Sequence, residues 1–506
     1  MKFNFSNKTK YTTTNHQVEV AYKTSAELEL YTSVVTASLS NTLYEKCNDK
    51  LNRIIELIGK VDPVFVAKLA IYAREQMYLR SVPLVLLAEL SKIHCGNGLV
   101  GKTTARVIQR ADEITELLAY YQLANARSGD KKLNRLSKQI QRGLASAFNK
   151  FDEYQFAKYN RKAEVTLKDA LFLSHPKATS EDQQVLFNKI AKDELQVPYT
   201  WEVELSELGK IKFESEKERK TAVRAKWEEL IGSGRLGYMA LMRNLRNILQ
   251  AEVKGSAIEK VVKTLADPKE VKRSKQLPFR FLAAYNELQP MRVNYISMVL
   301  NALEKAIQAS ADNISGFDLN TQVLIASDVS GSMFGGVGGK SKIRCYDIGL
   351  VLSMLLSNRS ENVITGIFGD RWKEVNLPKD NILSNVQHLK RIEGSVGYST
   401  NGYTVIDRMI EERRVMDKVM FFTDLQLWDS RYGGNTLQKS WNRYRREVAP
   451  NAKLYLFDLM GYGNTPLRVE RGDVNLIAGW SDKIFDVLTA IEEGGNALTQ
   501  IDQIEI

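Results

Sequence analysis

The pattern of apolar residues changes once along this chain of 506 residues, near residue 315. Before that point, segment after segment has apolar residues at helical spacing, as in DPVFVAKLAIYAREQMYLR, where Asp62 can cap a helix and Pro63 fits its first turn. After it, short apolar runs (TQVLIASD, NVITGIFG, KVMFFTD and KLYLFDL) alternate with helical segments. Such runs are typical of a parallel sheet covered on both faces. The sequence therefore predicts a multi-domain protein, with an all-α domain over residues 1–315 and an α/β, Rossmann-like domain over residues 316–506.

The helical part has no strict sequence period. A regular repeat of the ankyrin type is therefore excluded, whereas irregular helix pairs stacked in a HEAT-like helical repeat remain open.

The excess positive charge lies in the helical part. Residues 1–318 contain 49 Lys and Arg against 37 Asp and Glu, whereas residues 319–506 contain 22 against 23, so the net charges are +12 and −1. A basic region joined to a neutral one indicates a module that binds a polyanion, joined to a second module with a different role. A merely well-solvated surface is the alternative. Charge alone does not show whether the bound polyanion is RNA, DNA or membrane lipid.

The cysteines and the lengths of the apolar runs indicate the cellular compartment of the protein. The three cysteines, Cys47, Cys95 and Cys345, are scattered and odd in number, which argues against a disulfide framework and for a reducing compartment. The four histidines stand alone, so no zinc site is predicted. No apolar run approaches the roughly 20 residues that cross a bilayer, and the first residues lack the apolar core of a secretion signal. We therefore expect a cytoplasmic protein with no membrane partner.

The stretch GNGLVGKTT, residues 96–104, matches the phosphate-binding pattern G-x4-G-K-T. That pattern binds phosphate where a buried strand runs into the first glycine. Here the preceding residues include Glu89 and Lys92, which a central strand would not carry. We interpret the stretch as the end of one helix, capped at Gly96, with the next helix beginning at Lys102. It does not predict an ATPase.

A second motif, LIASDVSGSMF, places a D-x-S-x-S sequence directly after a predicted strand. Ligand sites in parallel sheets lie at the carboxyl ends of the strands, where GYSTNG and MFFTD also fall. Oxygen ligands completed by water suit Mg2+ or another divalent cation. The predicted metal ligands are Asp328, Ser330, Ser332, Thr400 and Asp424.

Two alternatives stay open for this motif. A strand-end Asp followed by Ser is often only a helix cap, and Thr404, one helical turn beyond Thr400, is a second candidate for the threonine ligand. No general base paired with a nucleophile lies nearby, so the predicted chemistry is binding, with no catalytic residues and no enzymatic activity.

The order D-x-S-x-S, Thr, Asp resembles the metal-ion-dependent adhesion site (MIDAS) of von Willebrand factor A domains. This motif, the basic helical part and three local segments together make the chain resemble the Ro autoantigen family, including its bacterial relatives. The three segments are LGYMALMRNLRNI, LFLSHPK and FAKYNRK. The resemblance covers nearly the whole chain in order and motif. It implies a TROVE domain whose helical repeats close into a monomeric ring, with one ring per chain, and no catalysis. Asn401 and the glycine-rich FGGVGGKSK depart from the expected metal loop, which leaves the ligand of the metal open.

Basic clusters in the helical part are the candidate RNA contacts. Lys158 and Lys162 are four residues apart with Arg161 beside them, so we expect them on one helix face, where clustered cations can contact phosphates. The resemblance places Lys158, Lys162 and His175 at the family positions for Y RNA, with Lys168 nearby. A helix-terminal role is the alternative for His175, and solvated charge for Lys168.

Two further segments carry cations at helical spacing. KKLNRLSKQIQR places Lys131, Arg135, Lys138 and Arg142 on one stripe. MRNLRN is expected to bury Leu241, Leu245 and Ile248 and to turn Arg243, Asn244, Arg246 and Asn247 outward. A solvated helix is the alternative for the stripe, and an ion pair with a neighbouring helix for Arg243.

The sequence and the resemblance together predict a ribonucleoprotein component for RNA quality control. The helical ring is expected to take single-stranded 3′ ends of misfolded structured RNA, and its outer face to bind Y-type RNA, by shape and unpaired ends rather than by sequence. The A domain is expected to bind Mg2+ and to dock a ligand or a protein, such as an exoribonuclease. The alternative is a protein-interaction scaffold with a metal-dependent adhesion domain and no specific RNA role.

Overall fold

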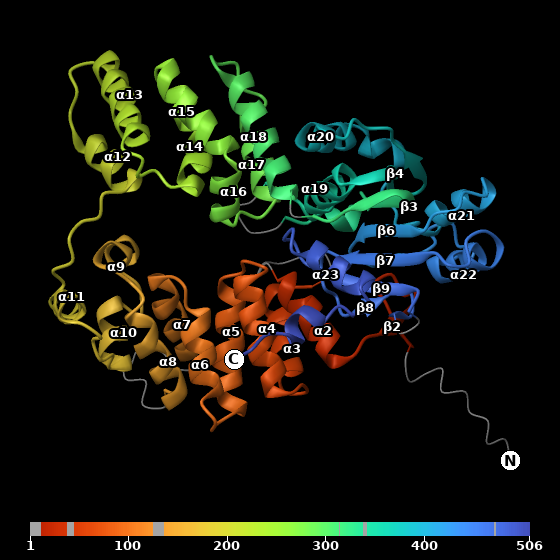
Figure 1. Cartoon of the computed structure of the whole chain (residues 1–506), viewed down its shortest axis with the longest axis horizontal. Coiled ribbons are helices and arrows are strands. Elements are labelled where there is room, and N and C mark those ends of the chain that lie inside the picture. Colours follow the sequence, from red (N-terminus) through yellow and green to blue (C-terminus); the bar gives the residue numbers. More distant parts are fainter. Residues whose placement is uncertain (1–11, 38–44, 125–135, 313, 337–341, 470–471) are drawn as a thin grey trace. The chain divides into compact units, whose positions relative to one another are not determined.

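The computed structural model describes the chain except for residues 1–11, 38–44, 125–135, 313, 337–341 and 470–471 (Figure 1). The described residues form two compact units. Unit 1 consists of Met1–Asn52 and Gly237–Thr499, and unit 2 of Arg53–Leu236 and Gln500–Ile506. No helix among the described residues is long and apolar enough to span a bilayer.

Unit 2 is built from helices, and none of its described residues lies in a strand. Its helices are α4 (Pro63–Glu75), α5 (Ser81–Ile93), α6 (Leu99–Val107), α7 (Ala111–Ala124), α8 (Lys138–Phe148), α9 (Glu153–Tyr159), α10 (Leu167–Ser174), α11 (Glu181–Lys192), α12 (Trp201–Lys210) and α13 (Glu216–Gly232), together with the second half of α3 (Cys47–Ile58). The sequence explains several starts: Asp62 accepts hydrogen bonds from the backbone at the start of α4, with Pro63 as the first helical residue.

Close helix contacts hold unit 2 together. Helices α6 and α8 pack against each other, and Gly143 of α8 lies so near α6 that a Cβ there would come within 2.5 Å of the Thr104 side chain and 2.7 Å of the Gly101 carbonyl. A salt bridge of 2.8 Å joins buried Arg74 to buried Glu113. Pairing compensates these charges for the loss of water.

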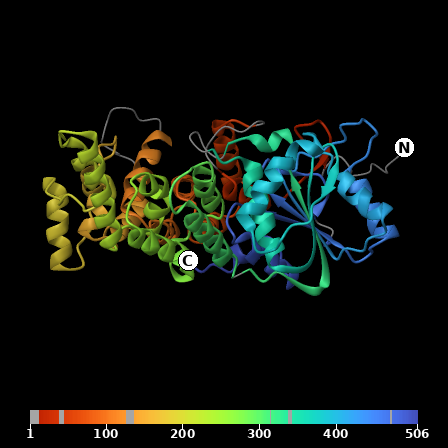
Figure 2. The same cartoon turned by 90° about the horizontal axis from the view of Figure 1, so that it is seen from above.

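Unit 1 contains the predicted parallel sheet. Its strand order is β5-β4-β3-β6-β7-β9, and all neighbours are parallel except β5, which is an antiparallel edge strand. The strands are β3 (Phe317–Asp328), β4 (Ser360–Phe368), β5 (Trp372–Glu374), β6 (Lys418–Thr423), β7 (Lys453–Asp458) and β9 (Val474–Ala478). Figure 2 shows helices on both sides of this sheet, as its doubly apolar strands require.

The remaining elements of unit 1 are mostly helical. They are α2 (Ala26–Val35), α14 (Tyr238–Gln250), α15 (Gly255–Ala266), α16 (Pro268–Ser274), α17 (Phe279–Leu288), α18 (Ile296–Ala311), η1 (Gly331–Phe334), α19 (Cys345–Asn358), α20 (Ile382–Ile392), η2 (Glu393–Val396), α21 (Tyr403–Glu411), α22 (Leu437–Glu447), α23 (Ile484–Glu492) and α24 (Thr499–Asp502), the last shared with unit 2, and the strands β1 (Thr12–Thr14), β2 (Val20–Lys23) and β8 (Asn464–Thr465).

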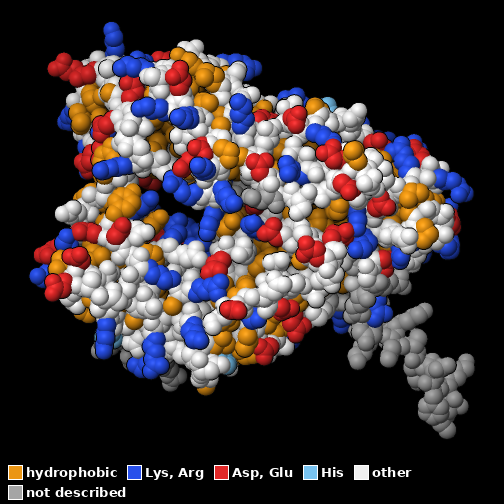
Figure 3. All heavy atoms as spheres, viewed as in Figure 1, with side chains coloured by type: hydrophobic (Ala, Val, Ile, Leu, Met, Phe, Trp, Pro, Cys, Tyr) orange, Lys and Arg blue, Asp and Glu red, His pale blue; other side chains and the backbone are white. Residues whose placement is uncertain are grey.

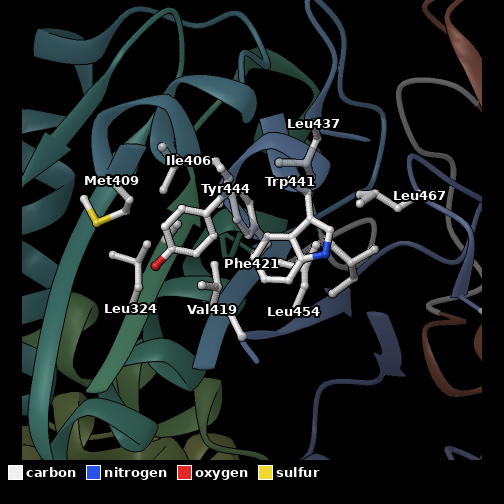
Figure 4. Packing of buried hydrophobic residues seen from close by; sticks show 14 of the residues in the cluster. Leu324, Ile406, Met409, Val419, Phe421, Leu437, Trp441, Tyr444, Leu454 and Leu467 are labelled. Carbon is white, nitrogen blue, oxygen red and sulfur yellow. The ribbon is translucent and has the colours of Figure 1, made fainter. Parts of the chain in front are cut away.

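The core of the α/β part lies between the sheet and the helices α21 and α22. Trp441 and Tyr444 of α22 point at Phe421 and Val419 of the sheet (Figure 4), and all four are completely buried. The next residue along β6, Phe422, lies on the opposite face and stacks on Phe457 at 4.3 Å. This alternation along one strand is why both faces need helices.

The N-terminal residues pack with the α/β part, which differs from the predicted division at residue 315. Strand β2 pairs with β8, more than 400 residues further along the chain. Asn15 donates a hydrogen bond to the Leu427 carbonyl (2.9 Å), and buried Lys50 donates one to the Met460 carbonyl (2.6 Å). These polar contacts between distant residues leave no periodic pattern in the sequence, so the helical prediction for residues 1–315 missed them.

Candidate nucleic-acid interface and metal centre

The predicted metal ligands meet at the carboxyl edge of the sheet in unit 1. Asp328 ends β3 and Asp424 follows β6, and both are buried. The hydroxyls of Ser330 and Ser332 lie 3.1 Å apart, and the carboxylates of Asp328 and Asp424 are close enough to interact electrostatically. Thr423 donates to Asp328 Oδ2 at 2.6 Å, and the Ser330 amide donates to Asp328 Oδ1 at 2.8 Å. Two carboxylates and two hydroxyls therefore share one small buried region.

Of the two candidate threonines, Thr400 is the one that reaches the Asp424 loop. Its hydroxyl, which is buried, donates to the Gln426 carbonyl at 2.9 Å. The Thr404 hydroxyl instead donates to the Asn401 carbonyl (2.7 Å), as expected at the start of α21. Asn401, which departs from the family pattern, is completely buried and donates to Asp370 and Ser430. Its amide thus holds the threonine loop in place.

The electrostatics of this cluster suit a cation. Burial, followed by the neighbouring charge of Asp424, raises the pKa of Asp328 to about 7, and burial also raises the pKa of Asp424. Asp424 Oδ2 is buried without a hydrogen-bond partner among the described residues. Two adjacent carboxylates in low dielectric repel each other and leave ligand positions open, which a divalent cation would relieve. The residues present therefore fit a cation with oxygen ligands.

Hydroxyl ligands are essential to this fit. Among the described residues, no group of three or more His, Cys, Asp or Glu could hold a metal by itself. An all-oxygen donor set with few charges is the kind that Mg2+ accepts, with water completing its shell.

Sequence reasoning missed a third carboxylate at the same edge. Asp458 ends β7, as Asp328 ends β3, and its Oδ1 accepts hydrogen bonds from the amides of Met460 (2.9 Å) and Gly461 (2.7 Å). Burial raises its pKa to about 6, against those hydrogen bonds and the charge of Lys50. The strand-end position in KLYLFDL was the available signal, because it repeats the position of Asp328.

A basic groove in unit 2 brings together three of the predicted RNA contacts. Lys138 and Arg142 of α8 lie in an open groove of about 550 Å³ with His175, at the end of α10. All three side chains are exposed. The groove also contains Asn149 and Lys177.

Amide side chains fix the walls of this groove. Gln141 of α8 donates to the Leu173 carbonyl at 2.8 Å, and Asn149 donates to the Lys177 carbonyl at 2.9 Å. His175 itself has left-handed backbone geometry, with φ of 49°, and caps α10 through its amide. The end of α10 is thereby held beside α8, which positions an imidazole next to two cations.

The prediction that Lys158 and Lys162 share a helix face is wrong. Helix α9 begins with a capping box at Asp152 and ends at Tyr159, because Asn160 leaves the helical conformation. Arg161 and Lys162 therefore lie in the connection to α10, where both are exposed. Lys158 remains on α9, with its ammonium 5.7 Å from the ring centres of Tyr154 and Tyr159.

The other predicted cations have different surroundings. Lys168 pairs with Asp193 at 2.7 Å, so its charge is compensated within the protein. Lys131 and Arg135 lie outside the described residues, so the predicted stripe is described only for Lys138 and Arg142, both on α8.

Arg243 and Arg246 lie in unit 1, on α14. They line a groove of about 980 Å³ together with Arg280 and Lys342. Arg246 and Lys342 both pair with Glu287, at 3.4 and 2.7 Å. The expected outward orientation of Asn244 is wrong, because its side chain is buried and donates to the Ala240 carbonyl. On the face shown in Figure 3, Lys and Arg are interspersed with Asp and Glu rather than gathered into one uniform patch.

The G-x4-G-K-T stretch has no phosphate-loop geometry. Residues 96–98 lie between helix α5 and helix α6, residues 99–104 belong to α6, and the element that precedes the stretch is a helix rather than a strand. Helix α6 begins at Leu99, earlier than the predicted Lys102, because the Asn97 side chain accepts from the Leu99 amide at 3.1 Å.

Family comparisons agree with this combination of a helical region and an α/β domain. The TROVE domain model matches residues 27–208 and 189–325, and the Ro60 vWA domain model matches residues 322–490. The chain belongs to the Ro autoantigen family, in which a TROVE domain precedes a von Willebrand factor A domain. It is thus of the RNA-binding, ribonucleoprotein type, in a family of RNA-binding proteins rather than enzymes, and non-coding RNA is the class of partner that the family implies.

Individual relatives are distant. The chain is 23% identical over 335 residues to telomerase protein component 1 of Mus musculus and 24% identical over 344 residues to that of Rattus norvegicus. Each match covers 52% of this chain but 13% of the relative, so the chain spans a small part of those proteins. The crystal structure of the Deinococcus radiodurans Ro (RSR) protein superposes with a TM-score of 0.58 at 19% identity, over 93% of this chain and all of that one. This similarity shows the fold.

Proposed function

We propose that this protein binds Y-type and misfolded structured non-coding RNA, and that the basic groove formed by α8, the end of α10 and Lys177 contacts the RNA backbone. The observation that carries the proposal is the meeting of Lys138, Arg142 and His175 in one open groove. Neither Lys138 nor Arg142 forms an ion pair with a described acidic residue, so both charges are available to phosphate oxygens. Asn149 and His175 add groups that can hydrogen-bond phosphate, ribose or base edges.

The wide, open shape of this groove suits contacts to the backbone of a structured RNA. The sequence of a base-paired RNA helix is poorly accessible, so proteins recognise its backbone, its shape and its unpaired ends. An open groove lined by two exposed cations fits backbone contacts of this kind. We accordingly propose that this groove holds the structured part of an RNA.

Single-stranded 3′ ends are the second part of the proposal. The ring of helical repeats that the family resemblance implies would accept such an end, and the cations of α14 are the candidate contacts in unit 1. Arg243 supports this assignment. It is exposed in the groove, and burial together with the charge of Arg243 lowers the pKa of Arg280 in the same groove. Two neighbouring guanidinium groups repel each other, and a bound phosphate would relieve that repulsion.

The A domain is proposed to bind Mg2+ through Asp328, Ser330, Ser332, Thr400 and Asp424. The cation, when bound, supplies a positive charge and a further coordination position for an oxygen of a docked ligand or protein. The orphaned Asp424 Oδ2 and the two carboxylates in one buried cluster support the proposal. The same proposal includes three further parts: the docked protein is an exoribonuclease, the protein is a monomer with one ring per chain, and it is cytoplasmic. These parts rest on the family resemblance and the cysteine usage.

Lysine footprinting tests the RNA groove. We expect a bound hairpin RNA to protect Lys138 and Lys177 from acetylation, because phosphate contacts would shield their ammonium groups. Lys217 and Lys220 on α13, which are also exposed, serve as controls and should react as in the free protein. The measurement is the acetylated fraction of each lysine by mass spectrometry. Equal reactivity of all four lysines with and without saturating RNA would contradict the proposed groove.

A further inference from the structure

Aromatic and cationic side chains form a cluster on the metal loop of unit 1 that none of the contacts above uses. We call it the aromatic rim, and it consists of Phe334, Arg344, Tyr346, Lys390 and Tyr398. The ring of Phe334 lies 5.3 Å from that of Tyr346 and 5.3 Å from that of Tyr398. The Arg344 guanidinium lies 5.1 Å from the centre of the Phe334 ring.

Tyr398 is fixed to the metal loop through its backbone. Its carbonyl accepts a hydrogen bond of 2.8 Å from the amide of Gly331, between the two predicted serine ligands. The side chain is nevertheless 49% exposed. Its ring meets that of Phe334 at an interplanar angle of 63°, so the two rings are not stacked on each other. An exposed tyrosine ring is thus held on the rim of the predicted metal site without a stacking partner in Phe334.

The charges of the rim differ in their availability. Lys390 pairs with the buried carboxylate of Asp347 at 2.7 Å, so its charge is compensated. Arg344 is exposed, and no acidic side chain among the described residues lies within ion-pair distance of its guanidinium. It lies over Phe334 and, at 5.9 Å, over Tyr346. These ring contacts orient the guanidinium and leave its hydrogen-bond donors for an anion.

An exposed aromatic ring next to an uncompensated arginine matches the chemistry of an unpaired nucleotide. Single-stranded nucleic acids are held by base stacking on aromatic side chains and by arginine contacts to phosphate. We propose that the aromatic rim binds one unpaired nucleotide of an RNA, with its base on Tyr398 and its phosphate on Arg344. This inference rests on the proposed RNA-binding function and deepens it, since it gives the A domain a direct RNA contact.

Crosslinking of a labelled tail locates this contact. The probe is an RNA hairpin with a single-stranded 3′ tail that carries 4-thiouridine at its unpaired positions, bound to the full chain and irradiated. Trypsin should release residues 392–408, which contain Tyr398, as one peptide between Arg391 and Arg408. We expect a crosslink on this peptide. Crosslinks confined to residues 53–236 would overturn the aromatic rim while leaving the groove of unit 2 intact.

Paired variants of Tyr398 separate stacking from folding. Tyr398→Leu keeps an apolar side chain but removes the aromatic face, and we expect it to weaken binding of the tailed hairpin about tenfold. Tyr398→Phe keeps the face and should bind like the parent protein, as should both variants with a blunt hairpin. Equal affinity of the Leu and Phe variants for the tail would overturn the proposal. If the parent protein bound neither hairpin, this result would instead contradict the proposed RNA-binding function itself.

Discussion

Replacing Lys138 and Arg142 together by Gln is expected to weaken binding of a structured RNA about a hundredfold. Each charge-assisted contact to phosphate contributes about 1.5 kcal/mol, so the loss of two corresponds to about 3 kcal/mol, or two decades in Kd. The slope of log K against log salt should also become shallower by about two, because two fewer counterions are released. Fluorescence anisotropy of a labelled hairpin across a salt series measures both quantities.

A matched variant distinguishes the groove from total charge. Replacing Lys217 and Lys220 by Gln removes the same charge from exposed positions on α13. It should change the affinity by less than about threefold, since only long-range attraction is lost. Both double variants should keep the thermal stability of the parent, because exposed substitutions seldom shift it by more than about 0.5 kcal/mol. Equal loss of affinity in the two variants would mean that RNA responds to net charge alone.

Replacing Asp424 by Asn is expected to abolish Mg2+ binding at the edge of the sheet. The change keeps the size of the side chain but removes one of two carboxylates among the five predicted ligands. In the parent protein, Mg2+ at a hundred times its Kd should stabilise the fold by about 2.7 kcal/mol, which raises the melting temperature. In Asp424→Asn we expect no rise. Without Mg2+ the variant should be at least as stable as the parent, because the repulsion between Asp424 and Asp328 is relieved.

The two threonines supply the control for this site. Thr400→Val removes a hydroxyl that faces the Asp424 loop, whereas Thr404→Val removes one that bonds within its own turn. Calorimetric titration with Mg2+ should therefore show weaker binding for Thr400→Val and unchanged binding for Thr404→Val. Full Mg2+ stabilisation of Asp424→Asn would contradict the proposed metal site.

Elements with a strong apolar pattern could be predicted from the sequence. The continuous apolar runs that became β3, β4, β6 and β7 define a doubly covered parallel sheet, and the helices that precede them follow from periodicity and caps such as Asp62 and Pro63. The position of Asp328 and Asp424 followed as well, because the carboxyl ends of parallel strands share one edge. Family comparisons confirm this order of a TROVE domain and an A domain.

The errors have local causes. Lys158 and Lys162 are four residues apart in a polar stretch, but the capping boxes at Asp152 and Thr166 divide that stretch into two short helices. Spacing alone cannot show that Asn160 ends the first of them. Asn244 was assigned to the surface by residue type, whereas its amide bonds to the preceding helical turn and lets it be buried.

Contacts between residues far apart in the chain could not be predicted from the sequence. Lys50, in a polar stretch of the first helices, hydrogen-bonds the Met460 carbonyl, a contact that depends on tertiary packing. The same holds for the aromatic rim, since Phe334, Arg344 and Tyr398 come from three separate segments around the metal loop. Each of these residues alone resembles an ordinary surface or core residue, and only their proximity suggests a function.

The most direct test of the central claim compares two RNAs in one salt series. One is a hairpin with a single-stranded 3′ tail, and the other is the same hairpin with a blunt end. The proposed function predicts a steep salt dependence for both, from the shared duplex contacts, and distinctly tighter binding of the tailed RNA. Weak binding of both with a shallow slope would contradict RNA binding and favour a protein-interaction scaffold, whose mainly apolar interface would respond little to salt.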